Sequence, residues 1–171
     1  HHAALDALEQ IGLADAPPSG VEILTKAGAI QGDDGRIRFP RALIDDMLAV
    51  ASKKVTLYSR DGENDLELWG DRVHYGTAGA AVHLVDVHGN EYRECTVQDL
   101  HDAAKIVQKL DNLHFFQRPM VCRDIPDNLE MDYNTIYAAC QGTTKHIGTS
   151  FSEPSHMKTC FDFIYDVAGG E

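Results

Sequence analysis

The sequence predicts an α/β protein in which a small mixed region precedes the first part of a (β/α)8 barrel. From residue 73 onward, strand patterns alternate with helix patterns three times up to residue 168, which favours parallel strands joined by right-handed crossovers. Each unit takes roughly 32 residues, so eight units would need about 256, close to the usual size of such a barrel. A chain of 171 residues holds only three units, and we therefore expect a fragment of a larger enzyme. A complete small α/β domain is the alternative.

Residues 1–72 form the predicted mixed region. Apolar periodicity predicts a helix that ends at Gly12 and a second that ends at Gly28, while Pro40 is well placed as the first residue of a third. Helices are expected over residues 1–11, 21–27 and 40–52, and short strands over 36–39, 55–60 and 66–68.

Residues 73–171 form the predicted barrel part. A hairpin is expected around residues 88–90, and Thr96 with Asp99 three residues later predicts a capped helix start. The strands of the three units are expected over 73–79, 114–118 and 146–151, and their helices over 97–110, 129–140 and 157–168.

Composition limits the function classes. The formal net charge of −12 disfavours binding to nucleic acid and to anionic membranes, and no apolar run is long enough to span a bilayer. The four cysteines are widely spaced, which predicts free thiols in a reducing cytoplasm. The nine histidines show no metal-ligand spacing, so we expect no metal site. His1 and His2 are either native or the remnant of a tag.

Candidate site residues follow from the barrel rule that reacting groups lie at the carboxyl ends of strands. Glycines there would let a bulky ligand approach the backbone, although a tight strand-to-loop turn is the favoured explanation for them. Conversely, His114 and His146 begin strands and are expected at the opposite, stabilising end. The substrate-binding candidates are Tyr75, Gly76, Thr77, Gly79, Gln117, Arg118, Thr149, Ser150 and Glu153. No catalytic residue is assigned.

The order and spacing of several short segments resemble the N-terminal part of the trimethylamine methyltransferase (MttB-like) family. No single segment is a catalytic signature, and the likeness lies in their succession along nearly the whole chain. The segments are Ala4–Leu13, Val21–Ala29, Arg36–Pro40, Leu57–Asp61, Val85–Asp86 with Arg93, Thr96–Leu100, Leu113–Phe115 and Lys145–His146.

The resemblance implies a barrel enzyme that moves a methyl group from a methylated amine, such as trimethylamine or glycine betaine, to the cobalt of a corrinoid. That corrinoid belongs to a separate partner protein, so no cofactor is bound directly. Some members carry pyrrolysine, at a position beyond residue 171.

The open edge of three parallel strands predicts a homo-oligomer. A non-catalytic small-molecule-binding or assembly domain is the alternative function, and a metal-dependent hydrolase is disfavoured by the missing ligand spacing.

Overall fold

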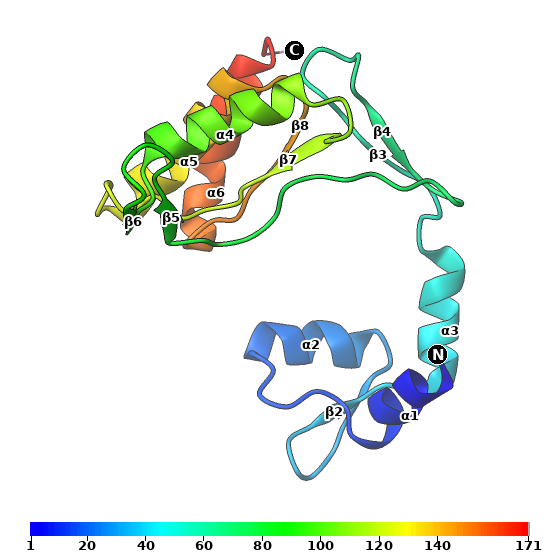
Figure 1. Cartoon of the computed structure of the whole chain (residues 1–171). Helices are drawn as coiled ribbons and strands as arrows, with labels where there is room; N and C mark the ends of the chain where they lie inside the picture. Colours follow the sequence, from blue (N-terminus) through cyan, green and yellow to red (C-terminus); the bar gives the residue numbers. More distant parts are fainter. Residues whose placement is uncertain (171) are drawn as a thin grey trace. The chain divides into compact units, whose positions relative to one another are not determined.

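The computed structural model describes residues 1–170 and divides into two compact units, residues 1–53 and the chain from Lys54 onward (Figure 1). The division precedes the hairpin of residues 55–68, whereas the sequence places the boundary at 72/73. The hairpin belongs with the second unit because Arg60, in the loop of the hairpin, makes two hydrogen bonds to residues later in that unit. Its backbone N–H donates to the Thr144 carbonyl at 2.8 Å, and its guanidinium donates to the Cys140 carbonyl at 2.7 Å.

In the first unit, the first two helices pack against a two-stranded antiparallel ribbon, and the third helix contacts the first. Ile37, fully buried, also forms an antiparallel bridge with Leu13. Gly12 has a φ of +70°, and a Cβ there would lie 2.2 Å from the Ile37 carbonyl oxygen, so this turn requires glycine. The elements are α1 (His2–Gln10), α2 (Pro18–Lys26), β1 (Ile30–Gln31), β2 (Ile37–Arg38) and α3 (Arg41–Val50).

The second unit begins with two antiparallel hairpins and continues with alternating strands and helices. Its elements are β3 (Val55–Leu57), β4 (Leu66–Leu68), β5 (His83–Val85), β6 (Tyr92–Glu94), α4 (Val97–Lys109), β7 (Phe115–Gln117), α5 (Asn128–Gly142), β8 (His146–Gly148), the 3-10 helix η1 (Pro154–His156) and α6 (Met157–Val167). The predicted hairpin around residues 88–90 is confirmed as β5 and β6, and Thr96 with Asp99 forms the predicted capping box.

Parallel pairing is confirmed between β7 and β8, with Phe115 opposite His146 and Gln117 opposite Gly148. The strand expected over 73–79 is reduced to a parallel bridge between Gly76 and Phe115. The Phe115 ring fills the space that a side chain at residue 76 would occupy, with a ring atom 2.4 Å from an added Cβ. The described residues therefore form a mixed α/β fold with small sheets.

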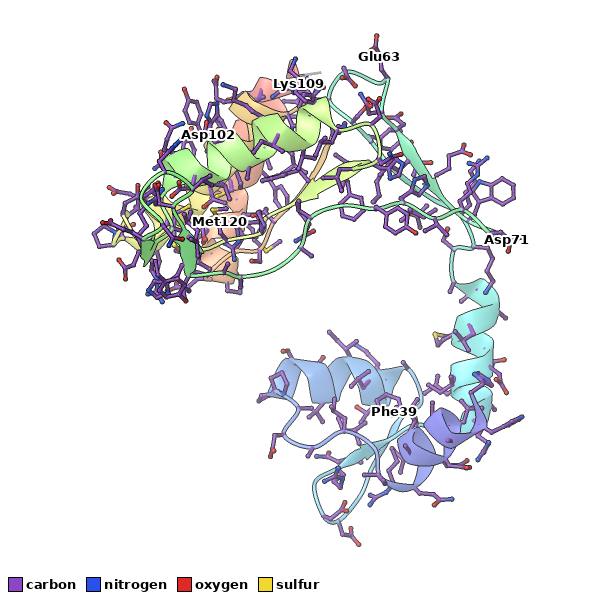
Figure 2. The ribbon with its side chains drawn as sticks, in the orientation of Figure 1. Phe39, Glu63, Asp71, Asp102, Lys109 and Met120 are labelled. Atoms are coloured by element: carbon purple, nitrogen blue, oxygen red, sulfur yellow. The ribbon has the colours of Figure 1, made fainter. Side chains whose placement is uncertain are left out.

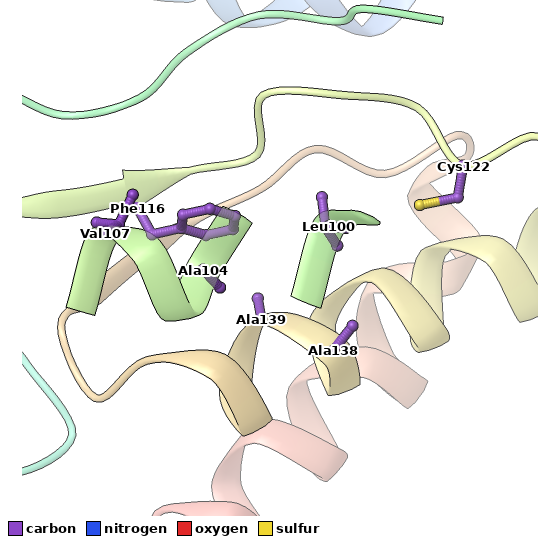
Figure 3. Packing of buried hydrophobic residues seen from close by; sticks show 7 residues of the cluster. All are labelled: Leu100, Ala104, Val107, Phe116, Cys122, Ala138 and Ala139. Carbon is purple, nitrogen blue, oxygen red and sulfur yellow. The ribbon is translucent and has the colours of Figure 1, made fainter. Parts of the chain in front are cut away.

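The main core of this unit lies where α4 and α5 pack together beneath β7 (Figure 3). It contains Leu100, Ala104, Val107, Phe116, Cys122, Ala138 and Ala139. On the opposite side of α4, Asp102 and Lys109 project outward (Figure 2). A second cluster joins Ile136 and Cys140 of α5 to Cys160 of α6.

All four cysteines are free and buried. Burial raises the pKa of the Cys122 thiol to about 11 and raises the pKa of the Cys140 and Cys160 thiols as well. These thiols therefore stay protonated near neutral pH and act as small apolar side chains. Among residues 1–170 there is no helix with the length and apolar character needed to cross a membrane.

Candidate functional site

Four of the sequence-predicted residues come together where β7 and β8 end; we call Thr77, Gln117, Arg118 and Ser150 the carboxyl-end cluster. The Thr77 hydroxyl donates to the Gln117 carbonyl at 2.6 Å. The Arg118 guanidinium donates to the Ser150 hydroxyl at 2.7 Å, and the Arg118 backbone N–H donates to the Gly148 carbonyl at 2.9 Å. The cause is topological, because parallel strands end at the same edge.

Glycines allow the close packing around this cluster. A Cβ at Gly148 would lie 1.9 Å from the Gln117 side-chain oxygen. Gly79 has a φ of +142°, and a Cβ there would lie 3.1 Å from the Pro119 carbonyl oxygen. The space beside Gly76 is taken by the Phe115 ring. The glycines at 76 and 79 therefore accommodate atoms of the chain itself.

Tyr75 lies at the other end of the strands, which corrects the expectation that it joins the cluster. Its backbone N–H donates to His114 Nδ1 at 2.9 Å, its carbonyl accepts from the His114 backbone N–H at 2.7 Å, and the two rings stack with centroids 6.4 Å apart. Because Gly76 is level with Phe115, Tyr75 is level with the start of β7. In the strand expected over 73–79, Tyr75 therefore lies near the start and not at the carboxyl end.

Thr149 is separate from the cluster contacts and lines a groove of about 310 Å³ between β8 and the helices α5 and α6. His146 lines the same groove. We expected His146 to lie at the end of the strands opposite to all the site candidates, and for Thr149 this expectation is wrong. His146 also bonds through Nδ1 with the Tyr58 carbonyl at 2.9 Å. Strand β8 spans only residues 146–148, so its first residue, His146, and the residue that follows it, Thr149, both line this groove.

A buried carboxylate near the last candidate, Glu153, was missed by the sequence analysis. Asp132 of α5 bonds to Ser152 and His156, which lie in the segment between β8 and α6. Glu153 Oε2 lies 3.9 Å from His156 Nε2. The available signal was an acidic residue among the apolar positions of a helix, beside Tyr133 and Ile136.

The carboxyl-end cluster contains one cationic side chain, Arg118, together with neutral hydroxyl and amide groups. Arg118 forms no ion pair with any residue in the range 1–170, and its one side-chain partner is the neutral Ser150 hydroxyl. Within the same range, no three His, Cys, Asp or Glu side chains are grouped to bind a metal ion. The arrangement can hydrogen-bond a polar ligand and counter a negative charge beside Arg118.

Comparison with known proteins gives a consistent result. A family model described as trimethylamine methyltransferase (MTTB) matches residues 1–171. Trimethylamine methyltransferase of Desulfitobacterium hafniense is 26% identical over 172 residues, covering 100% of this chain and 34% of the relative. That of Methanosarcina thermophila is 21% identical, covering 100% and 36%. A glycine betaine methyltransferase of D. hafniense is 27% identical over 141 residues, covering 80% and 29%. The chain thus spans about one third of the length of these curated relatives.

Proposed function

The chain belongs to the trimethylamine methyltransferase family, and from this premise we propose that it forms the N-terminal part of an enzyme that demethylates a methylated amine. Trimethylamine and a quaternary amine such as glycine betaine are the two substrate types, because relatives named for each cover most of the chain. The observation that supports this proposal most directly is the match of the family model to residues 1–171.

The complete enzyme would be a (β/α)8 barrel with its site at the carboxyl ends of the strands. Support comes from the parallel β7 and β8, each followed by a helix, and from the polar side chains gathered where these strands end. The four buried free thiols support a reducing, cytoplasmic location.

The methyl acceptor in this proposal is the corrinoid of a separate partner protein, which supplies the cobalt. The donors of the carboxyl-end cluster suit the amide and phosphate groups that a corrinoid carries, and Arg118 adds a positive charge for a phosphate or a substrate carboxylate. The residues of this chain would orient the amine and keep water away from the reacting carbon. Such alignment supplies much of the rate acceleration in a transfer that needs little proton chemistry.

The decisive experiment uses the full-length protein with reduced cobalamin and with the partner corrinoid protein. Trimethylamine and glycine betaine are offered separately, and mass spectrometry follows the demethylated amine while absorbance follows methylcobalamin. We expect both products from one of the amines and none from the 171-residue chain alone. A full-length protein that binds an amine without demethylating it would favour the binding-domain alternative instead.

Site placement is tested with matched variants in that protein. Arg118→Gln should reduce methyl transfer by about tenfold, the effect of losing one charged hydrogen bond. His114 lies at the other end of β7, so His114→Gln should mainly lower the free energy of unfolding. Equal losses of transfer with both variants, at unchanged folding, would place the site elsewhere.

A further inference from the structure

His114 accepts a hydrogen bond from the backbone of a neighbouring segment through one of its ring nitrogens. The Tyr75 N–H donates to His114 Nδ1 at 2.9 Å, and the His114 backbone N–H donates to the Tyr75 carbonyl at 2.7 Å. A backbone N–H can only donate, so Nδ1 holds a lone pair and the bonded imidazole is neutral. The protonation state of His114 in this contact therefore follows from its partner.

The contact lies at the start of the seam along which residues 75–77 run beside β7. Next to it, Gly76 forms a parallel bridge with Phe115, and at the other end the Thr77 hydroxyl donates to the Gln117 carbonyl at 2.6 Å. Residues 75–77 make a bridge and not a regular strand, so each hydrogen bond contributes a large share of what holds them against β7. The seam also determines where Thr77 of the carboxyl-end cluster lies.

His114 lines a polar cavity of about 510 Å³ together with three charged side chains. These are Asp65 from the loop between β3 and β4, Asp111 from the loop before β7, and Lys145 from the loop before β8. Two carboxylates and one ammonium leave one negative charge, and the Lys145 ammonium already donates to three backbone carbonyls. These charges suit an imidazolium, whereas the hydrogen bond from Tyr75 requires the neutral ring.

A second imidazole, His74, lines the same cavity. Its Nε2 lies 3.2 Å from the Glu67 carbonyl oxygen, which can only accept, so Nε2 is the donor whether the ring is neutral or charged. The rings of His74 and His114 meet edge to face with centroids 5.4 Å apart, and the Tyr75 ring stacks on His114 at 6.4 Å. Two charged imidazoles at this distance would repel each other, which would further open the seam.

We propose that His114 is a pH-sensitive latch on the seam between residues 75–77 and β7. While the ring is neutral, it accepts from Tyr75 and the seam is closed. When the ring takes up a proton, Nδ1 becomes a donor that faces the Tyr75 N–H, the hydrogen bond is lost, and the segment that carries Thr77 is released from β7.

The direction of the pH effect follows from proton counting. The closed seam requires one proton fewer on His114 than the open seam accepts, so a falling pH favours opening. The change is expected within the range of about pH 5–8 in which imidazoles gain or lose their charge. The latch is a property of the fold and does not rest on the proposed function.

Hydrogen–deuterium exchange of the full-length protein tests the latch. Mass spectrometry follows peptides that contain residues 75–77 at about pH 7.5 and about pH 5.5, on either side of the ordinary imidazole midpoint of about 6.5. Labelling times are scaled for the intrinsic pH dependence of amide exchange. A peptide from α4 reports any general loosening of the protein.

Three variants separate the histidines. In His114→Asn, the amide oxygen takes the place of Nδ1 as the acceptor, and the side chain does not titrate in this pH range. His74→Gln keeps an N–H donor in the place of Nε2 against the Glu67 carbonyl. His88→Asn, in the exposed turn between β5 and β6, is the matched control.

We expect the exchange protection of residues 75–77 in the wild type to fall by about tenfold from the higher to the lower pH, the effect of losing one hydrogen bond, while α4 keeps its protection. His114→Asn should remain protected at both pH values, and His74→Gln and His88→Asn should respond as the wild type does. Equal protection of the wild type at both pH values, the same loss in α4, or a pH response that persists in His114→Asn would overturn the inference. The wild-type comparison needs no variant, so it can refute the latch even where His114→Asn fails to fold.

Discussion

Asp99 shows how one side chain can stabilise a helix start in two ways. One carboxylate oxygen accepts the backbone N–H of Thr96 at 2.8 Å, which completes the capping box. Both oxygens accept from the Arg93 guanidinium, at 2.7 and 2.8 Å. This guanidinium, aided by the Thr96 contacts and opposed by partial burial, holds the pKa of Asp99 well below its ordinary value of 3.8. The stabilisation is therefore present above pH 3.8 and is lost as the pH falls below it.

Asp99→Asn should lower the free energy of unfolding at neutral pH by about 1–2 kcal/mol, because the cap is weakened and Arg93 loses its charged partner. At about pH 3 the difference from wild type should shrink, since the native carboxylate also begins to lose its advantage. Urea unfolding at both pH values measures this. Asp102→Asn, exposed on the same helix, serves as the control and should change stability by less than about 0.5 kcal/mol.

At the level of elements, the helices were largely predictable from the sequence because caps and apolar periodicity are local. The expected start of α4 at its Thr96 cap is confirmed, and the hairpin and β4 are found at the expected places. Very short elements carry too few residues for a pattern, so β1 and η1 were missed.

The candidate site was predictable only where strand direction determined it. Thr77, Gln117, Arg118 and Ser150 meet because their strands run parallel. Tyr75 was misplaced because the register with β7 depends on a glycine facing a ring, which sequence spacing does not encode. The bond between Asp132 and His156 joins residues far apart in sequence, and only the packing of the intervening β8 brings them together.

Gly142, in the last turn of α5, determines how closely that helix approaches α4. A Cβ there would lie 2.5 Å from the Ala104 Cβ and 2.8 Å from the His101 carbonyl oxygen. Gly142→Ala should therefore destabilise the protein by about 1–3 kcal/mol, although alanine is the better helix former. Gly20→Ala, within α2, places its Cβ at 3.4 Å from the Pro17 ring and should be stabilising by up to about 1 kcal/mol. Thermal unfolding of both variants tests the opposite signs; stabilisation by Gly142→Ala would contradict the close packing.

Lys145 closes the carboxyl end of α4 from the neighbouring loop. Its buried ammonium donates to the carbonyls of Val107, Leu110 and Leu113 at 2.9, 2.9 and 2.7 Å. Lys145→Met keeps the apolar stem but leaves these carbonyls unbonded, so the free energy of unfolding should fall by about 2–3 kcal/mol. Lys109→Met, exposed on the same helix, should have little effect. Equal chemical-denaturation curves for wild type and Lys145→Met would show that water replaces the ammonium without cost.

At the scale of the whole molecule, α6 presents an apolar stripe that the described residues leave exposed. Met157, Phe161 and Tyr165 follow one another at intervals of four, and their exposed fractions are 40%, 51% and 53%. Residues at this spacing share one helix face, and such a face favours association with another apolar surface. Together with the open edge of β8, this stripe motivates the expectation that the isolated 171-residue chain is oligomeric or prone to aggregate.

Phe161→Gln interrupts the stripe at its centre and should reduce both self-association of the 171-residue chain in sedimentation velocity and its binding of a hydrophobic dye. Val87→Gln removes an apolar side chain that is 90% exposed but lies in the β5–β6 turn, apart from any helix face, and should change neither measurement. The contrast matters because isolated exposed apolar residues are common on stable monomers, whereas a continuous face is not. A compact wild-type monomer that binds no dye would show that this face is compatible with water, and the argument for oligomerisation would then fall on the β8 edge alone.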